Sequence, residues 1–498
     1  MLTYIKETIK NSAIYGIGNI SVKLVGFILL PFLTNPEYLS VQNYGALGVL
    51  EAVNQIIIYL MGLGLYNAMF RWYYEQNEGE NKSTFFTTGL VVTSLVVLTI
   101  FLTWIFKKEA SQLLFGSLEY ERIIVLLMIS TGLQALGQLP ATLMRLQDRA
   151  IFFTTSNVIK LVVTMLVTLY YLLWLEEGLV SIYAGQIAGF SAYLILLVPY
   201  IFKNSTLKIH FVVFREMMGY GFSMMIAGLA GASINVLDRF VLNSMSGLEE
   251  VGFYSLGYKV SSILKVFVIG SISMALTPII FRKINDADSH RFYRKTMTYY
   301  GFGMMICIMG ISLFSKEVLK IFTGSTLYWS SFTIIPILAF GLYFAALKDI
   351  VATGLHVTKK TSRISLVTTI ISVLNLTLNI LLIPYLGAEG AALASLLSQF
   401  AYFVGIYYFS NRLYPIKFEW KKIILMFVLG LLLVYSALLT NNMSLTIRLF
   451  VKTSALISFP LILYFFNFYE DVELQQIAKI WKNWRNPKRW KSNIRNLF

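Results

Sequence analysis

The stretch NSAIYGIGNISVKLVGFILLPFL, residues 11–33, decides the fold of this chain. As a helix that rises about 1.5 Å per residue, it is long enough to cross a lipid bilayer. Lys23 lies about 18 Å along this helix, and an ammonium group near the middle of the hydrocarbon costs about 2.5–3.5 kcal/mol. Asn11, Tyr15, Asn19 and Lys23 recur every four residues and share one helical face. We therefore expect a membrane helix that lines a wet, cationic cavity; the alternative is a lysine that snorkels or pairs with an acid.

The composition is that of a polytopic membrane protein. Of the 498 residues, 57% are hydrophobic and 13% are charged, and the mean hydropathy is +0.68. A soluble protein of this length carries more charge. The single cysteine, Cys307, excludes an intramolecular disulfide. We expect no cleaved signal peptide, because the first apolar segment is too long and further spans follow it.

We predict an all-α membrane protein with fourteen transmembrane helices. Each corresponds to a window of about 20 mainly apolar residues. The expected helices cover residues 11–33, 44–70, 84–106, 122–144, 151–175, 179–202, 217–243, 251–281, 298–314, 331–356, 363–386, 388–410, 422–440 and 446–468.

The lysine and arginine residues between these spans and at their ends indicate the orientation of the chain. With a cytoplasmic N-terminus, 28 of them, Arg145 included, fall on the cytoplasmic side and 6 on the outer side. This positive-inside asymmetry predicts that both termini are cytoplasmic. It also assigns most of the net charge of +16 to loops that face anionic lipid, so we expect no nucleic acid partner. The tail at residues 470–498 mixes Trp481, Trp484 and Trp490 with basic residues, which is typical of a segment lying on the inner membrane surface.

Three landmarks recur at nearly the same offset and indicate an internal repeat. They are residues 148–152 and 359–363, Glu177-Gly178 and Glu389-Gly390, and Tyr44-Gly45 and Val251-Gly252, with offsets of 211, 212 and 207 positions. Because six helices per half is an even number, the halves are expected to be related by an axis along the membrane normal. We predict six-helix bundles at 1–210 and 211–415, two more helices within 416–469, and the tail at 470–498.

Most charged residues inside the predicted spans are basic. In the fifth helix Asn157, Lys160 and Thr164 share a face, and in the eighth helix Ser261 and Lys265 share a stripe. Interhelical hydrogen bonding is the alternative for the hydroxyl and amide positions, and Asp238–Arg239, Lys348–Asp349 and Glu51 with a lysine can neutralise one another. Lys23, Lys160, Lys259 and Lys265 still outnumber the remaining acid. Since unpaired cations in a low-dielectric site are costly, we expect an anionic ligand such as a phosphate or pyrophosphate.

Residue patterns typical of enzymes are missing from the sequence. His210, His290 and His356 are scattered without metal-ligand spacing, and no G-x-x-x-x-G-K-[ST] phosphate loop is present. The first outer loop, 34–43, carries only Glu37 as an acid, whereas a lipid-dependent glycosyltransferase is expected to carry several acids in an outer loop. We therefore expect no enzymatic activity, no metal and no cofactor.

Short motifs in both halves carry a family resemblance. The first helix reads KLVGFILLPFLT over 23–34, and the second ends in GLGL over 62–65. The seventh helix carries Leu237-Asp238-Arg239, and the boundary of the eleventh and twelfth reads Asn375, Asn379, Ile383-Pro384, Gly387 and Gly390-Ala391-Ala392. In order and spacing, over residues 10–410, the chain resembles the polysaccharide-transporter branch of the multidrug/oligosaccharidyl-lipid/polysaccharide exporter (MOP) superfamily, the Wzx-type flippases.

The resemblance implies two six-helix bundles around a central cavity, two additional C-terminal helices and alternating access. It implies a cargo of undecaprenyl-pyrophosphate-linked oligosaccharide, of the O-antigen or capsule type, moved from the inner to the outer leaflet of a bacterial inner membrane. Cationic cavity residues are a feature of such flippases, and Lys23 and Arg239 lie in the matching stretches. The expected partners are this lipid-linked cargo, membrane lipids, a polysaccharide polymerase and a chain-length regulator.

Together, the residues and the resemblance predict a site. We predict that the pyrophosphate is bound by Lys23, Lys160, Arg239, Lys259 and Lys265. The predicted polar lining of the cavity is Asn19, Glu51, Asn157, Thr164, Asp238, Ser261, Asn375 and Asn379. A cation-coupled multidrug exporter of the same fold, a flippase for the peptidoglycan precursor and a membrane glycosyltransferase or polymerase are the alternatives. The exporter branch usually carries acids in its N-terminal half, whereas the first helix here offers Lys23 and no acid.

Overall fold

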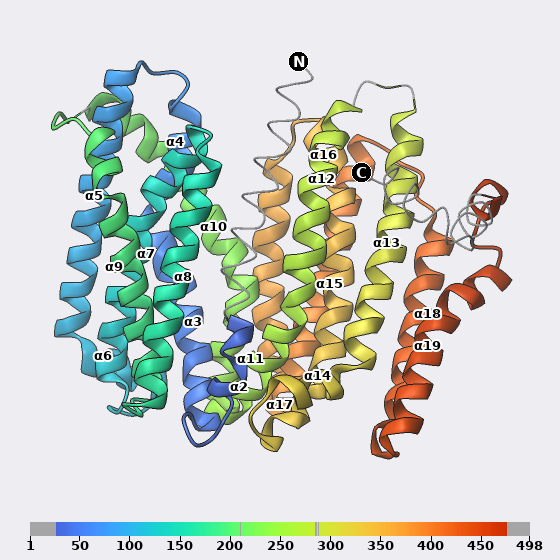
Figure 1. Cartoon of the computed structure of the whole chain (residues 1–498). Coiled ribbons are helices and arrows are strands. Elements are labelled where there is room, and N and C mark those ends of the chain that lie inside the picture. The colour runs from blue at the N-terminus through green and yellow to red at the C-terminus, as the bar shows by residue number, and fades with distance from the viewer. Residues whose placement is uncertain (1–25, 210, 284–285, 287, 476–498) are drawn as a thin grey trace, which may run out of the picture. The chain divides into compact units, whose positions relative to one another are not determined.

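A computed structural model describes residues 26–209, 211–283, 286 and 288–475 of the chain, and within these residues every regular element is a helix (Figure 1). From the start of the described part to the middle of the chain, the helices are α2 (Leu30–Leu33), α3 (Val41–Gly62), α4 (Leu65–Trp72), α5 (Glu78–Ile105), α6 (Lys107–Phe115), α7 (Glu121–Leu146), α8 (Ala150–Leu173), α9 (Leu179–Lys203) and α10 (Phe211–Ser246). They are followed by α11 (Leu248–Ile263), the π-helix η1 (Leu264–Ile269), α12 (Gly270–Arg282), α13 (Ser289–Leu313), α14 (Ser315–Phe322), the 3-10 helix η2 (Thr326–Phe332), α15 (Ile334–Val351), α16 (Thr353–Val357), α17 (Ser362–Leu413), α18 (Trp420–Leu438), the 3-10 helix η3 (Leu439–Asn442) and α19 (Leu445–Phe465).

The prediction of an all-α polytopic membrane protein is confirmed. Twelve helices in the described part of the chain are long and apolar enough to cross a bilayer, compared with the fourteen expected. The first expected helix, 11–33, lies largely outside the described residues, and so do Asn19 and Lys23. The expected spans 363–386 and 388–410 together form α17, which bends at Gly387, where φ is 52° and ψ is −131°.

The second expected span is broken into α3 and α4 at Leu63 and Gly64, both of which have positive φ. The break also brings α10 close, because a Cβ on Gly64 would lie 2.0 Å from the carbonyl oxygen of Gly221. Only glycine tolerates both this backbone conformation and this contact. The GLGL sequence over 62–65 therefore ends one helix and starts the next at an angle to it.

The sequence repeat has a counterpart in the backbone. Asp148 and Lys359, 211 positions apart, have φ of 55° and 56°, and each comes shortly before a long helix, α8 or α17. Gly178 and Gly387, 209 positions apart, have φ of 49° and 52° and precede α9 and the second part of α17. Non-glycine residues rarely adopt the left-handed region, so the same turn is built at matching positions of the two halves.

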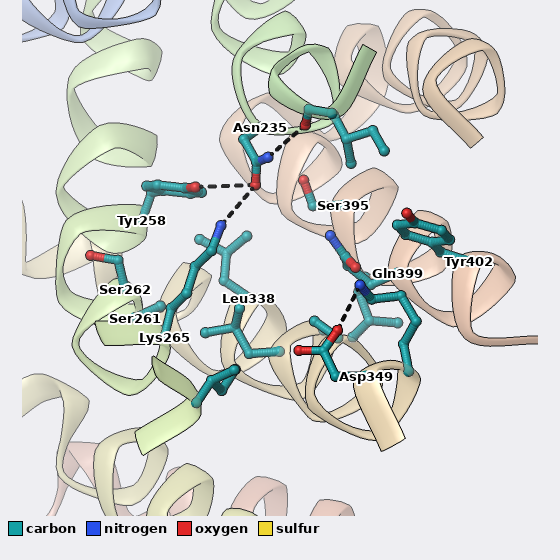
Figure 2. A pocket seen from close by; sticks show the side chains of 18 of the residues that line it. Asn235, Tyr258, Ser261, Ser262, Lys265, Leu338, Asp349, Ser395, Gln399 and Tyr402 are labelled. Atoms are coloured by element: carbon teal, nitrogen blue, oxygen red, sulfur yellow. Dashed lines mark hydrogen bonds and ion pairs between the residues drawn. The ribbon is translucent and has the colours of Figure 1, made fainter. Parts of the chain in front are cut away.

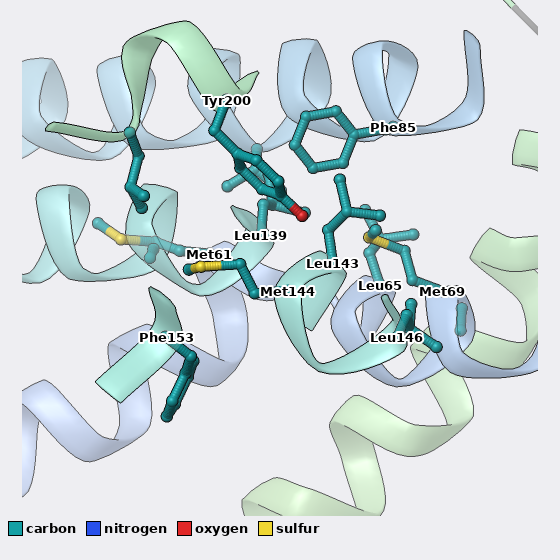
Figure 3. Close-up of a cluster of buried hydrophobic side chains, with 14 of the residues drawn as sticks. Met61, Leu65, Met69, Phe85, Leu139, Leu143, Met144, Leu146, Phe153 and Tyr200 are labelled. Atoms are coloured by element: carbon teal, nitrogen blue, oxygen red, sulfur yellow. The ribbon is translucent and has the colours of Figure 1, made fainter. Parts of the chain in front are cut away.

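A cluster of buried apolar side chains joins α3, α4, α5, α7, α8 and α9 of the N-terminal half (Figure 3). Leu65 and Met144 are fully buried in it, and Tyr200 of α9 and Phe85 of α5 contribute rings. In a membrane the lipid is as apolar as these side chains, so close packing rather than removal from water stabilises the cluster. The cluster fixes the helices that surround the N-half cavity described below.

The helices form two compact units, residues 1–289 with 315–415, and residues 290–314 with 416–498. The second unit contains α13, α18 and α19. In it Phe302 stacks on Phe459 with ring centroids 6.0 Å apart, and the Lys295 Nζ lies 2.9 Å from a Glu419 carboxylate oxygen. The bundle limits expected from the sequence, at 210, 415 and 469, stay a prediction, and residues 476–498 of the tail lie outside the described part.

Candidate functional site

The N-terminal and C-terminal halves meet where α3 and α11 begin. A Cβ on Gly45 would lie 1.8 Å from the carbonyl oxygen of Leu248, and one on Gly252 would lie 2.8 Å from that of Val41. Gly45 and Gly252 are 207 positions apart, as are Val41 and Leu248, so the two contacts are equivalent under the repeat. Small residues allow such close backbone approach between membrane helices. The contact joins the two halves at this end of both helices.

Three cavities follow one another through the first unit. An N-half cavity of about 450 Å³ lies between α3, α7, α8 and α9. A central cavity of about 650 Å³ lies between α3, α4, α7, α10 and α11, and it shares Gln138 and Arg145 with the N-half cavity. A C-half cavity of about 290 Å³ lies between α10, α11, α15 and α17, and it shares Gly231, Asn235, Tyr258 and Lys265 with the central cavity. The shared residues make the three cavities neighbours across both halves.

The N-half cavity contains one of the predicted lysines. The Lys160 Nζ donates a hydrogen bond to Asn157 Oδ1 at 2.7 Å and lies 5.0 Å from the ring centre of Phe190. The i, i+3 spacing on α8 brings Lys160 and Asn157 together. Thr164, one turn further along, lines the same cavity. The predicted polar face of the fifth helix therefore faces a cavity.

Arg145 lies at the junction of the N-half and central cavities. Its guanidinium group donates to Thr142 Oγ1 at 3.2 Å and lies 5.1 Å from the ring centre of Phe70. The sequence predicts Arg145 in a cytoplasmic loop, whereas the structure includes it in the last turn of α7. Gln134, Gln138 and Arg145 follow one another at i, i+4 and i+11, a helical spacing that could have revealed this face.

Lys265 lies where the central and C-half cavities meet (Figure 2). Its Nζ donates to Asn235 Oδ1 at 3.3 Å, and the Tyr258 hydroxyl donates to the same oxygen at 3.4 Å. Lys265 belongs to the π-helix η1, a local widening of the helix that is frequent at functional sites. Ser261, also predicted, lines the C-half cavity.

The C-half cavity holds an ion pair between neighbouring residues of α15. The Lys348 Nζ lies 2.9 Å from Asp349 Oδ1 and 4.7 Å from the ring centre of Tyr402. Figure 2 shows Asp349 on the other side of the pocket from Lys265. The local neutralisation considered from the sequence is therefore present at Lys348.

Lys259 and Glu51 form an ion pair between the two halves. The Lys259 Nζ lies 3.9 Å from a Glu51 carboxylate oxygen, and a Cβ added to Gly26 would lie 3.4 Å from the Lys259 Cε. Neither residue lines the three cavities. Lys259 thus differs from Lys160 and Lys265, which form no ion pair with any carboxylate in the described part of the chain.

The remaining predicted residues of the described part are buried and line none of the three cavities. Arg239 is 2% exposed; its guanidinium group lies 4.7 Å from the ring centre of Tyr258 and donates to Ser255 Oγ at 3.4 Å. Asp238 accepts a hydrogen bond from the Tyr254 hydroxyl. Asn375 donates to Ser398 Oγ at 3.1 Å, and Asn379 donates to the carbonyl oxygen of Asn375 at 2.9 Å. The first two groups link α10 to α11, and Asn375 holds together the two parts of α17.

The site has the donors for an anion but not the ligands for a metal. Within the described residues no group of three His, Cys, Asp or Glu side chains is close enough to hold a metal ion. Lys160, Arg145 and Lys265 follow one another through the N-half, central and C-half cavities, with amides from Asn157, Gln138 and Asn235 beside them. Ammonium and guanidinium groups of this kind bind phosphate and carboxylate groups.

Comparison with known families gives two matches. Residues 8–284 match a family described as polysaccharide biosynthesis protein, and residues 223–381 match the MatE family. The chain is 30% identical over 176 residues to a putative O-antigen transporter of Shigella flexneri, a match that covers 33% of this chain and 41% of that protein. It is 23% identical over 401 residues to a probable low-salt glycan biosynthesis flippase of Haloferax volcanii, covering 77% of this chain and 80% of that protein.

Among solved structures, the chain is similar to the lipid II flippase MurJ in an inward closed conformation. The TM-score is 0.71 and the identity 15%, and the match covers 91% of this chain and 99% of that chain. At this identity the likeness shows the fold alone. The architecture is thus that of the MOP superfamily, to which both matched families and this structure point.

Proposed function

The chain belongs to the polysaccharide biosynthesis protein family, and from this membership we propose that it is a flippase for a lipid-linked polysaccharide repeat unit. The cargo is an oligosaccharide of the O-antigen or capsule type on undecaprenyl pyrophosphate, moved from the inner to the outer leaflet. The named relatives that support this proposal are an O-antigen transporter and a glycan flippase.

The observation that carries the proposal is the series of joined cavities with lysines that have no acidic partner. Lys160 and Lys265 line these cavities and form no ion pair with a carboxylate in the described part of the chain. A cation in such a site is costly unless water or an anion compensates for it. A pyrophosphate group supplies that compensation, and its own passage through hydrocarbon becomes less costly beside the ammonium groups.

The proposed mechanism divides the cargo between three environments. The pyrophosphate group binds Lys160 or Lys265, and Lys23, in the undescribed N-terminal segment, stays in the proposed set. The sugars occupy the polar lining formed by residues such as Gln138, Asn235 and Gln399. The polyprenyl chain stays in lipid. Transport then requires the contact between Gly45 and Leu248 to open while the opposite end closes, which is a rocking motion of the two halves.

The cellular setting follows from the same proposal. The excess of basic residues on one side favours cytoplasmic N- and C-termini, and a lipid-linked repeat unit is made at the inner face of a bacterial cytoplasmic membrane. A polymerase and a chain-length regulator that receive the flipped units are the proposed protein partners. The protein acts as a transporter rather than as an enzyme.

A cation-coupled drug exporter is the second candidate, favoured by the match of residues 223–381 to the MatE family. A flippase for the peptidoglycan precursor is a third, since its cargo carries the same pyrophosphate group. Deletion of the gene, followed by its return on a plasmid, distinguishes the three candidates. Loss of the gene removes surface polysaccharide in the first case, raises drug sensitivity in the second and stops cell-wall synthesis in the third. Incomplete sugars on the lipid would instead indicate a glycosyltransferase or polymerase.

The sharpest test replaces Lys160 and Lys265 by glutamine, singly and together, in cells that lack the natural copy. Each substitution is expected to reduce flipping about ten- to hundredfold, because a hydrogen bond to a charged group contributes about 1.5–3 kcal/mol. The measurement is the fraction of lipid-linked repeat units that a membrane-impermeant oxidant reaches from outside. Complete units should accumulate on the inner leaflet.

Lys108→Gln is the matched control, because Lys108 is an exposed lysine of α6 that lines none of the three cavities. Its flipping rate should equal that of the unaltered protein. Normal flipping by the double variant, at normal protein abundance, would contradict the proposal.

A further inference from the structure

A fourth pocket, separate from the three cavities, lies at one end of the N-terminal half. Its volume is about 600 Å³, and it is formed where α4, α7 and α9 end and where α5 and α8 begin. Apart from Leu143, the residues that line it are polar or aromatic. They are Tyr73, Tyr74, Gln76, Glu78, Asn81, Lys82, Gln147, Arg149, Lys203 and Asn204. Because it is built from the ends of membrane-crossing helices, it lies near the level of the lipid headgroups.

The pocket carries more positive than negative charge. Lys82, Arg149 and Lys203 line it, against a single acid, Glu78. Glu78 is already paired with Lys82, at 2.8 Å. Neither Arg149 nor Lys203 forms an ion pair with a carboxylate within residues 26–209, 211–283, 286 and 288–475, and the Arg149 guanidinium group lies 5.4 Å from the ring centre of Tyr200. Two positive groups therefore remain for a ligand.

Gln76 adds a buried donor that has no acceptor. Its Oε1 accepts a hydrogen bond from Thr84 Oγ1 at 3.0 Å, which orients the amide. Its Nε2 is buried and donates to no atom in the described part of the chain. An unpaired buried donor is unfavourable, so native structures seldom retain one without a reason. Gln76 lines the same pocket as Arg149 and Lys203.

Hydrogen bonds hold in place the part of the pocket formed by the α7–α8 turn and the end of α9. Gln147 Nε2 donates to Asn204 Oδ1 at 2.9 Å, and the Tyr200 hydroxyl donates to Gln147 Oε1 at 2.9 Å. These bonds tie the turn between α7 and α8 to the end of α9. Arg149 and Lys203, which lie in these two segments, are thus held close together before any ligand binds.

Exposed apolar side chains stand beside the basic residues. Tyr74 is 72% exposed, Ile151 68% and Phe202 74%. Ile151 is two residues from Arg149, and Phe202 precedes Lys203. Aromatic and apolar side chains next to basic ones are typical of the membrane–water boundary. A ligand with an apolar chain fits this boundary better than a freely dissolved ion.

We propose that this pocket binds the phosphate group of an anionic membrane lipid, through Arg149, Lys203 and the Gln76 amide. The site lies outside the three cavities of the proposed transport route, and the proposal does not depend on the identity of the cargo. Such a lipid would hold together the ends of α5, α8 and α9.

To test this proposal, the purified full-length protein is titrated separately with phosphatidylglycerol, phosphatidylcholine and inorganic phosphate. Native mass spectrometry measures the affinity for each. Arg149→Gln with Lys203→Gln is expected to weaken phosphatidylglycerol binding about tenfold or more, since each basic group near an anionic lipid contributes about a factor of five. Gln76→Glu keeps the shape and the acceptor for Thr84 but puts a negative charge in the pocket, and it should weaken binding as well. The charge-retaining pair Arg149→Lys with Lys203→Arg should bind almost normally.

Lys108→Gln with Lys208→Gln is the control of equal charge change, because both lysines are exposed and neither lines the pocket. Unchanged phosphatidylglycerol affinity in the Arg149 and Lys203 double variant would overturn the proposal. So would inorganic phosphate or phosphatidylcholine that binds as tightly as phosphatidylglycerol. Either result leaves the flippase proposal untouched, since that rests on Lys160 and Lys265.

Discussion

At the scale of single residues, the structure separates charged groups that are fully buried or paired with an acid from lysines that line a cavity with no acidic partner among the described residues. Arg239 packs on Tyr258, and Lys348 pairs with Asp349. Lys160 and Lys265 have only amide partners and aromatic rings in the described part of the chain. A lysine that pairs with an acid already has its charge compensated, whereas a lysine without one in a low-dielectric site needs water or an anion. The lysines without an acid are therefore the better candidates for ligand binding.

Glu419 gives a residue-scale prediction for the second unit. Burial alone would raise the pKa of this carboxyl, but hydrogen bonds from Thr298 Oγ1 at 2.7 Å and from Lys295 Nζ at 2.9 Å outweigh it and lower the pKa. Glu419→Gln should destabilise this unit by about 1–3 kcal/mol at neutral pH. A carboxyl with a lowered pKa stabilises the fold above its unfolded pKa and loses that contribution as the pH falls through its folded pKa.

The difference in melting temperature between Glu419→Gln and the unaltered protein should therefore shrink below about pH 4. Thermal unfolding in detergent at both pH values measures it. Glu249→Gln, at an exposed position of α11, is the control and should change neither melting temperature. A difference of equal size at neutral and acidic pH would count against this role for Glu419.

At the scale of the elements, the pairing of α3 with α11 is the joint between the two halves. Gly45 faces the backbone of Leu248, and Gly252 faces that of Val41, in contacts that the repeat makes equivalent. Elsewhere the ends of helices repeat as well, as the left-handed residues Asp148 and Lys359 show. The same local sequence signals thus build both halves, and small residues allow them to meet.

Gly45→Ala should weaken the closure at the start of α3, because the added Cβ would lie 1.8 Å from a backbone oxygen that cannot move without its helix. A cysteine at Gln55, which lines the central cavity, should then become severalfold more reactive toward an impermeant thiol reagent added on the side where α3 begins. All variants also carry Cys307→Ser, so that the introduced cysteine is the one thiol that can be labelled. Gly89→Ala, where the new Cβ meets its nearest neighbour at 4.0 Å, should leave the labelling unchanged. Equal labelling in both variants would contradict this role for the contact between Gly45 and Leu248.

At the scale of the whole molecule, the proposed transport route depends on residues that two cavities share. Gln138 and Arg145 join the N-half to the central cavity, and Gly231, Asn235, Tyr258 and Lys265 join the central to the C-half cavity. A large cargo needs these junctions to be open. The first junction is formed by residues of the N-terminal half and the second by residues of the C-terminal half, so both halves contribute to one proposed route.

Gly231→Phe should block the junction between the central and C-half cavities without disturbing the fold. A Cβ at Gly231 meets nothing within 4 Å, so the ring can enter the cavity. Flipping should fall about tenfold or more while the melting temperature stays unchanged, since glycine in a helix is itself slightly unfavourable. Gly219→Phe is the control, because Gly219 also lies on α10 with open space around it but lines no cavity described above. If both variants transport equally well, the junction is not part of the route.

The sequence by itself determined the class of fold and most of its helices. A helix in lipid forms its backbone hydrogen bonds internally and needs about 20 mainly apolar residues. Runs of this length can be recognised in a single sequence. The repeat was also visible, in the turns at Asp148 and Lys359 and in the contacts of Gly45 and Gly252, but the counterpart of Gly178 is Gly387 and not the expected Gly390. So was the polar face of Asn157, Lys160 and Thr164, since a face depends only on the helical period.

Only the tertiary structure decided what each polar face meets. Arg239 was expected in the cavity but is buried against Tyr258, whereas Arg145 was counted with the loops and lines two cavities. Periodicity shows that side chains share a face, but the neighbour of that face comes from helices distant in sequence. Whether a lysine meets an acid, a ring or an open cavity is therefore fixed by the packing of the two halves and not by local pattern.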